Sequence, residues 1–183
     1  MAVHDPVHDL RARDPELQAL LDKKAIEEVL VLYLRGCDRA DISLVEQAYH
    51  PDAWEDHGGT FNGPASAWID LSRERLPKMG LINHLMTNLM IELDGDRATA
   101  EAYILTASRL KVRGEWLDTR TLARTVDLFE KRDGAWKIAR RTMAWEWNEE
   151  HAITETWARG VITDDPSVLT RGGKMPNDIL YAA

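Results

Sequence analysis

A carboxylate occupies a position where the sequence predicts an apolar side chain. Apolar residues from Leu17 to Cys37 recur at steps of three and four, and Asp38 follows Leu34 by four residues on the same helical face. An ionised carboxylate there is costly unless it is paired, hydrogen-bonded or close to water in a cavity. We therefore expect a partner for Asp38. A cap of the helix end is the alternative interpretation.

His84 is the candidate partner. It lies early in a predicted strand, where alternation places it on one face with Met86, Asn88 and Met90. A carboxylate that accepts a hydrogen bond from one ring nitrogen fixes the tautomer, and the other nitrogen can then act as a general base near neutral pH. A lone histidine in a strand is more often structural, so this interpretation depends on a contact with Asp38.

Tyr33 precedes Asp38 by five residues and can share a cavity with it. Its phenol could polarise a carbonyl or protonate a leaving hydroxyl group, although a core tyrosine whose hydroxyl merely finds a partner fits the pattern equally well. Cys37 faces the apolar side without a cationic neighbour, so we interpret it as part of the core.

The sequence does not predict a metal or a cofactor. The run from His50 to His57 is rich in metal-ligand types, but it lacks HExxH or any other regular ligand spacing, and alternation sends Asp56 and His57 to opposite faces. The chain also lacks a GxGxxG turn, a GxxxxGK[ST] loop and a GxSxG elbow. Any chemistry is therefore expected to come from the side chains alone.

The predicted elements form an α+β domain. An arm (1–13) precedes a core (14–147), which is followed by a C-terminal helix at about 149–159 and a tail, all within a single domain (1–183). Helices come first and an antiparallel meander follows, so we expect a curved, mostly antiparallel sheet that wraps around the helices as a conical barrel. The expected helices span 14–39, 41–49 and 64–76, and the expected strands span 53–57, 81–93, 97–111, 117–130 and 135–147.

Composition excludes several classes of function. The 183 residues carry a formal net charge of −8 without a long basic stripe, so we expect no nucleic-acid partner. The longest apolar stretch is far shorter than the roughly 20 residues that cross a bilayer, so no membrane partner is expected. The single cysteine and the charged N-terminus favour a cytoplasmic location.

Several short motifs, in this order and spacing, resemble the SnoaL-like (polyketide-cyclase-like) branch of the nuclear-transport-factor-2-like superfamily. The resemblance covers roughly residues 17–147. Its carrying segments are Ala25–Asp41, Tyr49–Ala53, Phe61–Gly63, His84 with Asn88, Asp94–Asp96 and Gly134–Arg141.

The resemblance implies a cone-shaped fold with a deep apolar cavity and cofactor-independent chemistry. Similar proteins include dehydratases of scytalone and of bile acids, a dehydrochlorinase of hexachlorocyclohexane, and lyases that release formaldehyde from diarylpropanes. By this resemblance Asp38 and His84 form an acid/base dyad that Tyr33 assists, and a homo-oligomer, with a trimer favoured, is expected. The best candidate for a further polar group in the cavity is Tyr103.

Our leading hypothesis is a lyase that acts on a hydrophobic, aromatic hydroxylated small molecule. Asn88 would orient this substrate, and the apolar wall would be formed by Trp54, Met86, Met90 and Trp145. The leading reaction is a dehydratase-type elimination, and three alternatives remain open. One is a non-catalytic small subunit of a ring-hydroxylating dioxygenase, and the second is an aldol cyclase or isomerase with the same acid/base groups. The third is a carbon–carbon lyase that releases formaldehyde, whose base would take a hydroxyl proton.

Overall fold

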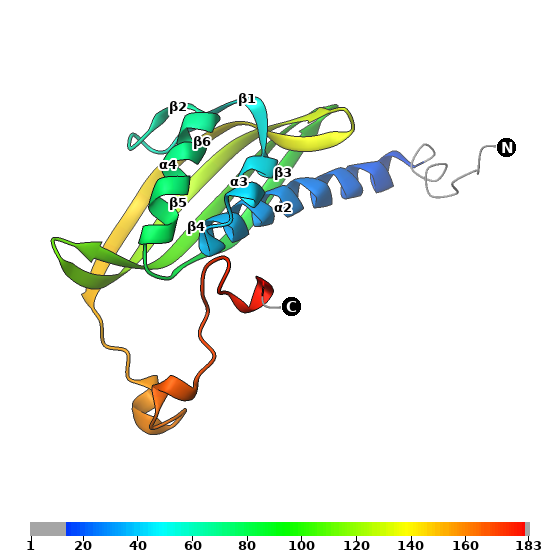
Figure 1. Cartoon of the computed structure of the whole chain (residues 1–183). Coiled ribbons are helices and arrows are strands. Elements are labelled where there is room, and N and C mark those ends of the chain that lie inside the picture. The colour runs from blue at the N-terminus through cyan, green and yellow to red at the C-terminus, as the bar shows by residue number, and fades with distance from the viewer. Residues whose placement is uncertain (1–13, 182–183) are drawn as a thin grey trace.

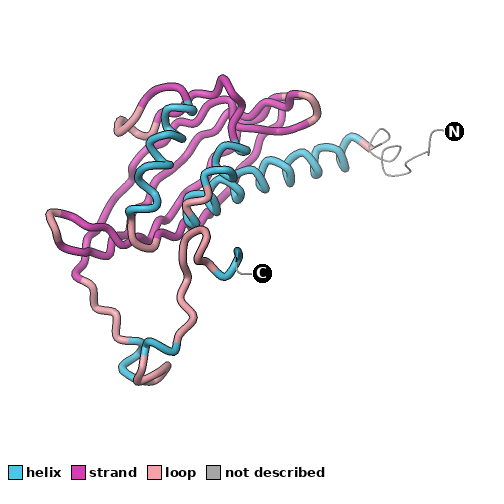
Figure 2. The backbone as a smooth tube through the Cα atoms, viewed as in Figure 1, coloured by secondary structure: helices cyan, strands magenta, loops and turns pink. Residues whose placement is uncertain are grey.

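The computed structural model describes residues 14–181, so the expected N-terminal arm (1–13) lies outside the described residues. Figure 1 shows a long helix and two shorter ones on one side of a curved sheet, and Figure 2 shows the same path coloured by element. The helices are α2 (Pro15–Arg39), α3 (Ile42–Ala48) and α4 (Ala65–Arg75). The strands are β1 (Tyr49–Asp56), β2 (Asn62–Pro64), β3 (Ile82–Asp94), β4 (Arg97–Val112), β5 (Glu115–Arg132) and β6 (Ala135–Ala152).

The six strands form one sheet in the order β2-β1-β6-β5-β4-β3. All neighbouring pairs are antiparallel except β1 and β6, which are parallel. Within the described residues, β2 and β3 are the two edges and do not pair, so the curved sheet stays open. The α+β architecture predicted from the sequence is confirmed, with an open cone in place of a closed barrel.

Helix α2 positions its last turn against β3. Asp14 caps its first turn by accepting hydrogen bonds from the backbone N–H groups of Glu16 and Leu17. The helix ends at Arg39, and its C-cap Ala40 adopts a left-handed conformation with φ 52°. Its apolar face, including Ile26 and Leu30, is buried in the core. Asp38 consequently lies in the last helical turn, next to the edge strand.

A bulge in β3 reverses the alternation on which our prediction for this strand rested. The register shifts between Thr87 and Met90, and Asn88 sits at the shift with φ 53°. Before the bulge His84 and Met86 face inward, whereas after it Leu89 packs against the core. The single extra residue therefore separates Asn88 and Met90 from the face of His84.

The expected C-terminal helix at 149–159 is wrong. Strand β6 continues to Ala152, which pairs with Leu117, because the long strand β5 offers backbone partners along this whole stretch. Only a short 3-10 turn, Trp157–Gly160, follows. The chain then loops outward and returns to the end of α2, as the orange and red segments in Figure 1 show.

The returning tail is fastened beside Asp38. The backbone N–H of Met175 donates to the carbonyl of Arg39 over 2.8 Å, and the hydroxyl of Tyr181 donates to Oδ2 of Asp41 over 2.8 Å. Asp178 and Arg39 lie 3.4 Å apart between these two bonds. We refer to residues 173–181 as the strap.

Candidate active site

Asp38 and His84 are in direct contact. Oδ1 of Asp38 lies 2.6 Å from Nδ1 of His84 and 3.1 Å from its backbone nitrogen, so one carboxylate holds both the ring and the strand. An ionised carboxylate can only accept, so His84 donates its Nδ1 proton, and in the neutral ring Nε2 carries the lone pair. Their side chains are 14% and 16% exposed, which leaves them accessible at the edge of a cavity.

The cavity has a volume of about 300 Å³ and lies between the helices and the concave face of the sheet. Because water occupies about 30 Å³ in the liquid, this space holds on the order of ten non-hydrogen atoms. Apolar residues of α2 and β3 form much of the wall, and short hydroxyl side chains of β4 and β5 supply its polar floor. The hydroxyl-bearing members are Thr106, Ser108, Thr119, Thr121 and Thr125.

Tyr33 lines the cavity, and its hydroxyl is fixed by α4. Trp68 donates from Nε1 to the Tyr33 oxygen over 3.2 Å. Burial raises the pKa of Tyr33 well above its usual value, and the nearby Cys37 and Glu55 act in the same direction. The phenol therefore stays protonated and can serve as a hydrogen-bond donor.

Two residues predicted for the apolar wall line the cavity, and so does Cys37. Met86 and Trp145 contribute to its wall, and the indole Nε1 of Trp145 donates to the carbonyl of Gly58 over 3.1 Å. Cys37 is buried there, and desolvation raises its pKa to about 12. The thiol is therefore protonated at neutral pH, in agreement with its interpretation as a core residue.

Four residues that the sequence pattern placed in the cavity do not line it. Asn88 and Met90 are exposed because of the bulge in β3. Tyr103 points to the opposite face of β4 from its neighbour Ile104, which lines the cavity. Trp54 is 40% exposed and donates from Nε1 to Oδ1 of Asn62, 2.7 Å away.

Arg141 is a cavity residue that the sequence analysis left largely unassigned. It is buried, and its Nε and one terminal nitrogen donate to the two oxygens of Asp127 over 2.7 and 2.8 Å. Burial disfavours the guanidinium charge, but Asp127 outweighs that cost and holds the pKa of Arg141 well above its usual value. Alternation from the buried Trp136 and Ile138 would turn Arg140 inward, but a register shift between Ile138 and Arg140 turns Arg141 inward instead.

A second carboxylate–histidine pair borders the cavity. Oε1 of Glu55 lies 2.8 Å from Nδ1 of His57, and the Glu55 side chain is fully buried. His57 lines the cavity and stacks on Trp68 with ring centroids 3.9 Å apart. The contact of His57 with Glu55 was not predicted from the sequence, although residues two apart share a strand face.

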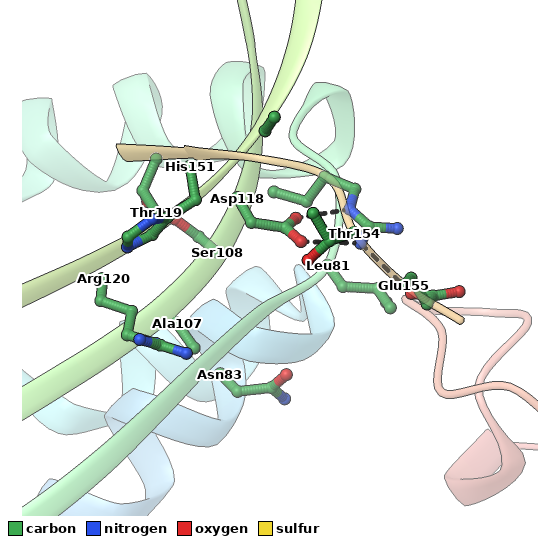
Figure 3. A pocket seen from close by; sticks show the side chains of 12 residues that line it. Leu81, Asn83, Ala107, Ser108, Asp118, Thr119, Arg120, His151, Thr154 and Glu155 are labelled. Atoms are coloured by element: carbon green, nitrogen blue, oxygen red, sulfur yellow. Dashed lines mark hydrogen bonds and ion pairs between the residues drawn. The ribbon is translucent and has the colours of Figure 1, made fainter. Parts of the chain in front are cut away.

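A larger groove of about 540 Å³ has a different character. Figure 3 shows its lining, which includes Asn83, Asp118 and His151, and it shares Ser108 and Thr119 with the cavity. Its central ions already satisfy one another, because Arg109 donates to both oxygens of Asp118 and to Glu155. It offers no apolar enclosure, so the cavity beside His84 is the better candidate for an active site.

Residues 18–142 match the SnoaL-like domain family. The match covers more than half of the chain, and with the fold described above it places the protein in a class of small α+β domains that enclose a cavity. The chain belongs to the SnoaL-like domain family. Among curated proteins, none matches it significantly.

Solved structures of similar fold include several enzymes. A hexachlorocyclohexane dehydrochlorinase, LinA type 2, is 22% identical with a TM-score of 0.69, and the alignment covers 84% of this chain and 99% of that one. The type 3 enzyme from Novosphingobium barchaimii LL02 is 21% identical with a TM-score of 0.68, covering 76% and 99%. A proposed scytalone dehydratase from Novosphingobium aromaticivorans DSM 12444 is 18% identical with a TM-score of 0.65, covering 74% and 91%. These similarities establish the fold.

Two further observations concern the described residues only. No helix within 14–181 is both long and apolar enough to cross a membrane. The same part of the chain contains no group of three or more His, Cys, Asp and Glu side chains arranged to hold a metal ion.

Proposed function

We propose that the protein is a cofactor-independent lyase that eliminates a leaving group from a small aromatic hydroxylated molecule. The observation that carries this proposal is the 2.6 Å contact between Asp38 and His84 at an apolar cavity. A carboxylate-oriented imidazole in such a place is suited to remove a proton from a substrate. The dioxygenase-subunit alternative gives no reason for this inward contact.

In the proposed reaction, Nε2 of His84 accepts a proton from the carbon next to a carbonyl group. The electron pair of the broken C–H bond forms the C=C double bond while the C–O bond breaks, and the leaving hydroxide takes up a proton to depart as water. Tyr33 donates a hydrogen bond to the oxygen on which negative charge develops. A variant in which a C–C bond breaks with loss of formaldehyde would use the same base on a hydroxyl proton.

The cavity volume narrows the substrate class. Room for on the order of ten non-hydrogen atoms fits one substituted aromatic ring better than a fused polycycle. Trp68, Trp145 and Met86 supply flat or soft apolar surface around it.

The test uses two probe substrates, so that base catalysis can be measured without knowledge of the natural substrate. The ring opening of 5-nitrobenzisoxazole requires a base in an apolar pocket and releases a coloured phenolate. Dehydration of 4-hydroxy-4-phenylbutan-2-one requires the same base and the departure of hydroxide. We expect His84→Ala to slow both reactions by about 10²–10⁴-fold and Asp38→Asn to slow them in the same range, with unchanged circular dichroism. Equal rates in wild type and His84→Ala would overturn the proposal.

We also propose that the protein associates with further copies of itself through the outer face of the sheet, with a trimer as the expected state. One apolar residue from each of four neighbouring strands lies in a single row across this face: Leu85, Leu105, Leu122 and Trp147. The ion pairs Arg120–Glu149 and Arg124–Glu146 flank the row, so the face carries both charge signs and can complement a second copy. Trp147→Glu is expected to lower the mass measured by sedimentation equilibrium toward that of the monomer. A wild-type protein with the mass of a monomer would contradict the proposal.

A further inference from the structure

We propose that Glu55 and His57 form a second proton-transfer pair in the cavity, in which His57 binds the departing or developing oxyanion of the substrate opposite His84. This inference rests on the proposed elimination, because it assigns the group that protonates the leaving oxygen. Its ligand class is an oxyanion on a small aromatic molecule, such as a phenolate, enolate or alkoxide.

The strand order places the two histidines on opposite sides of the same space. His84 lies on the edge strand β3, and His57 follows β1, which is separated from β3 by β6, β5 and β4. Both histidines line the one cavity of about 300 Å³. A substrate that fills this cavity therefore contacts His84 at one wall and His57 at the other.

The orientation of His57 is fixed from two directions. Glu55 accepts its Nδ1 proton, and the ring stacks on Trp68 with an angle of 26° between the planes. Trp145 meets the ring edge-on, with centroids 5.7 Å apart. Nε2 is the remaining polar atom of the ring, and no hydrogen-bond partner for it occurs among the described residues. This nitrogen is thus available to a ligand.

The charges around the two pairs differ, and this difference assigns the roles. Glu55 is fully buried. Besides His57, the only hydrogen-bond donor to its carboxylate among the described residues is the neutral hydroxyl of Tyr49, 2.7 Å away. The nearest buried cation, Arg141, is already engaged by both oxygens of Asp127. Glu55 and Asp127 are both register partners of Arg141, and burial together with Glu55 raises the pKa of Asp127, so a second positive charge would stabilise the two carboxylates. The imidazolium form of His57 supplies that charge, and the stacked indole of Trp68 stabilises it.

Asp38 has other partners. Its oxygens accept from the backbone N–H of His84, and Lys174 of the strap is close enough to interact with it electrostatically. These groups stabilise the negative charge of Asp38, so a proton on Nε2 of His84 is not required to balance it. One histidine is left as a base and the other as an acid, as elimination requires.

In the reaction, the N–H at Nε2 of His57 donates its proton to the leaving oxygen as the C–O bond breaks. Water departs, and His57 is left neutral while His84 carries the proton taken from carbon. Transfer of one proton to solvent from His84 and uptake of one by His57 restores the starting state. Glu55 is a positioning residue, because it acts through His57.

The first test needs no substrate. In the full-length protein labelled with ¹⁵N-histidine, we expect both ring nitrogens of His57 to be protonated at pH 7, whereas His84 shows a proton on Nδ1 only. Glu55→Gln should convert His57 to a neutral ring. A neutral His57 in the wild type would overturn the inference, whatever the outcome for catalysis.

The second test measures binding of 4-nitrophenolate against its neutral analogue nitrobenzene. His57→Gln is expected to weaken phenolate binding by at least 10-fold and nitrobenzene binding by less than 3-fold. Equal losses for both ligands would mean that His57 only shapes the cavity and would contradict the proposal. His50→Gln is the matched control, because His50 is a buried histidine of β1 whose Nε2 contacts the carbonyl of Glu130 outside the cavity.

Leaving-group dependence separates this inference from the proposed function. His57→Gln should slow dehydration of 4-hydroxy-4-phenylbutan-2-one by more than 100-fold but the ring opening of 5-nitrobenzisoxazole by less than 10-fold, because the phenolate leaves without a proton. If His84→Ala has no effect on either probe, the lyase proposal fails, and the labelling and phenolate experiments still decide the role of His57. If His57→Gln slows both probe reactions by the same factor, the assignment of His57 as the acid is contradicted and the lyase proposal is unaffected.

Discussion

The guanidinium carbon of Arg141 lies 4.2 Å from the centroid of the Tyr33 ring, so a buried cation covers one face of the phenol. Asp127 accepts two hydrogen bonds from Arg141 and holds the guanidinium in place. The position of the Tyr33 ring is therefore coupled to an ion pair that spans β5 and β6. Such cation–π contacts are worth more when they are desolvated, as this one is.

Replacement of Tyr33 by phenylalanine should remove a hydrogen-bond donor from the cavity and keep the ring over Arg141. We expect dehydration of 4-hydroxy-4-phenylbutan-2-one to slow by about 10-fold, the equivalent of roughly 1.4 kcal/mol for one hydrogen bond. Steady-state kinetics give the measurement. Tyr103→Phe is the control, since Tyr103 lies outside the cavity, and equal effects of the two substitutions would contradict this role for Tyr33.

Replacement of Arg141 by methionine should destabilise the fold strongly. It leaves Asp127 buried without a partner, which costs about 3–5 kcal/mol in the free energy of unfolding. The double variant Arg141→Met with Asp127→Leu is expected to recover much of the loss. Urea denaturation followed by tryptophan fluorescence measures both, and Arg140→Met, at the exposed neighbouring position, should change stability by less than about 0.5 kcal/mol.

The bulge in β3 should depend on the residue at its centre. Asn88 has φ 53°, a conformation that asparagine and glycine tolerate and that costs other L-residues about 1–2 kcal/mol. Asn88→Val is therefore expected to lower the free energy of unfolding by at least this amount, whereas Asn88→Gly should be nearly neutral. If valine were also neutral in urea denaturation, the bulge would not impose the conformation.

Attachment of the strap should weaken in acid. Burial acts to raise the pKa of Asp41, but hydrogen bonds from Ser43 and Tyr181 outweigh it and lower the pKa below its usual value. Stabilisation by the ionised Asp41 is thus complete above the usual carboxyl range and is lost as the pH falls through the lowered pKa. We expect the amide resonance of Met175, which reports the contact with Arg39, to shift toward its unstructured position at low pH.

Tyr181→Phe tests the same attachment by a second route. It removes one of the bonds that lower the pKa of Asp41, so the Met175 resonance should shift at a higher pH than in the wild type. Tyr103→Phe should not change the pH at which the Met175 resonance shifts. A transition that is identical in Tyr181→Phe and the wild type would show that Asp41 does not hold the strap.

The sequence predicted the main helices and the long strands because their signals are local. The Asp14-Pro15 start and the three- and four-residue apolar steps define α2, and glycine-containing turns separate the long strands. That Asp38 needs a partner followed from the cost of a carboxylate on an apolar face, whereas its pairing with His84 was implied by the resemblance to the SnoaL-like family. These features required no knowledge of how distant strands pair.

Features that depend on register were not predictable in the same way. A one-residue bulge at Asn88 moved Met90 away from the cavity, and alternation alone cannot reveal a bulge. Strand β6 extended beyond its predicted end because β5 was available as a partner. The inward orientation of Arg141 and its bond to Asp127 likewise depend on the pairing of β5 with β6. Glu55 and His57 are different, because their spacing of two residues was visible in the sequence.

The strap, residues 173–181, is fastened to the end of α2, beside His84. A second hollow of about 730 Å³ borders Asp38 and His84 on this side, with Ile179 and Leu180 of the strap in its wall. The segment shared with the SnoaL-like family ends at residue 142, before Trp145 and the strap. Exchange of residues 143–183 between relatives would therefore alter the strap and the Trp145 side of the cavity wall while it keeps Asp38 and His84. The proposed base and the segment that borders it on this side thus belong to separable parts of the chain.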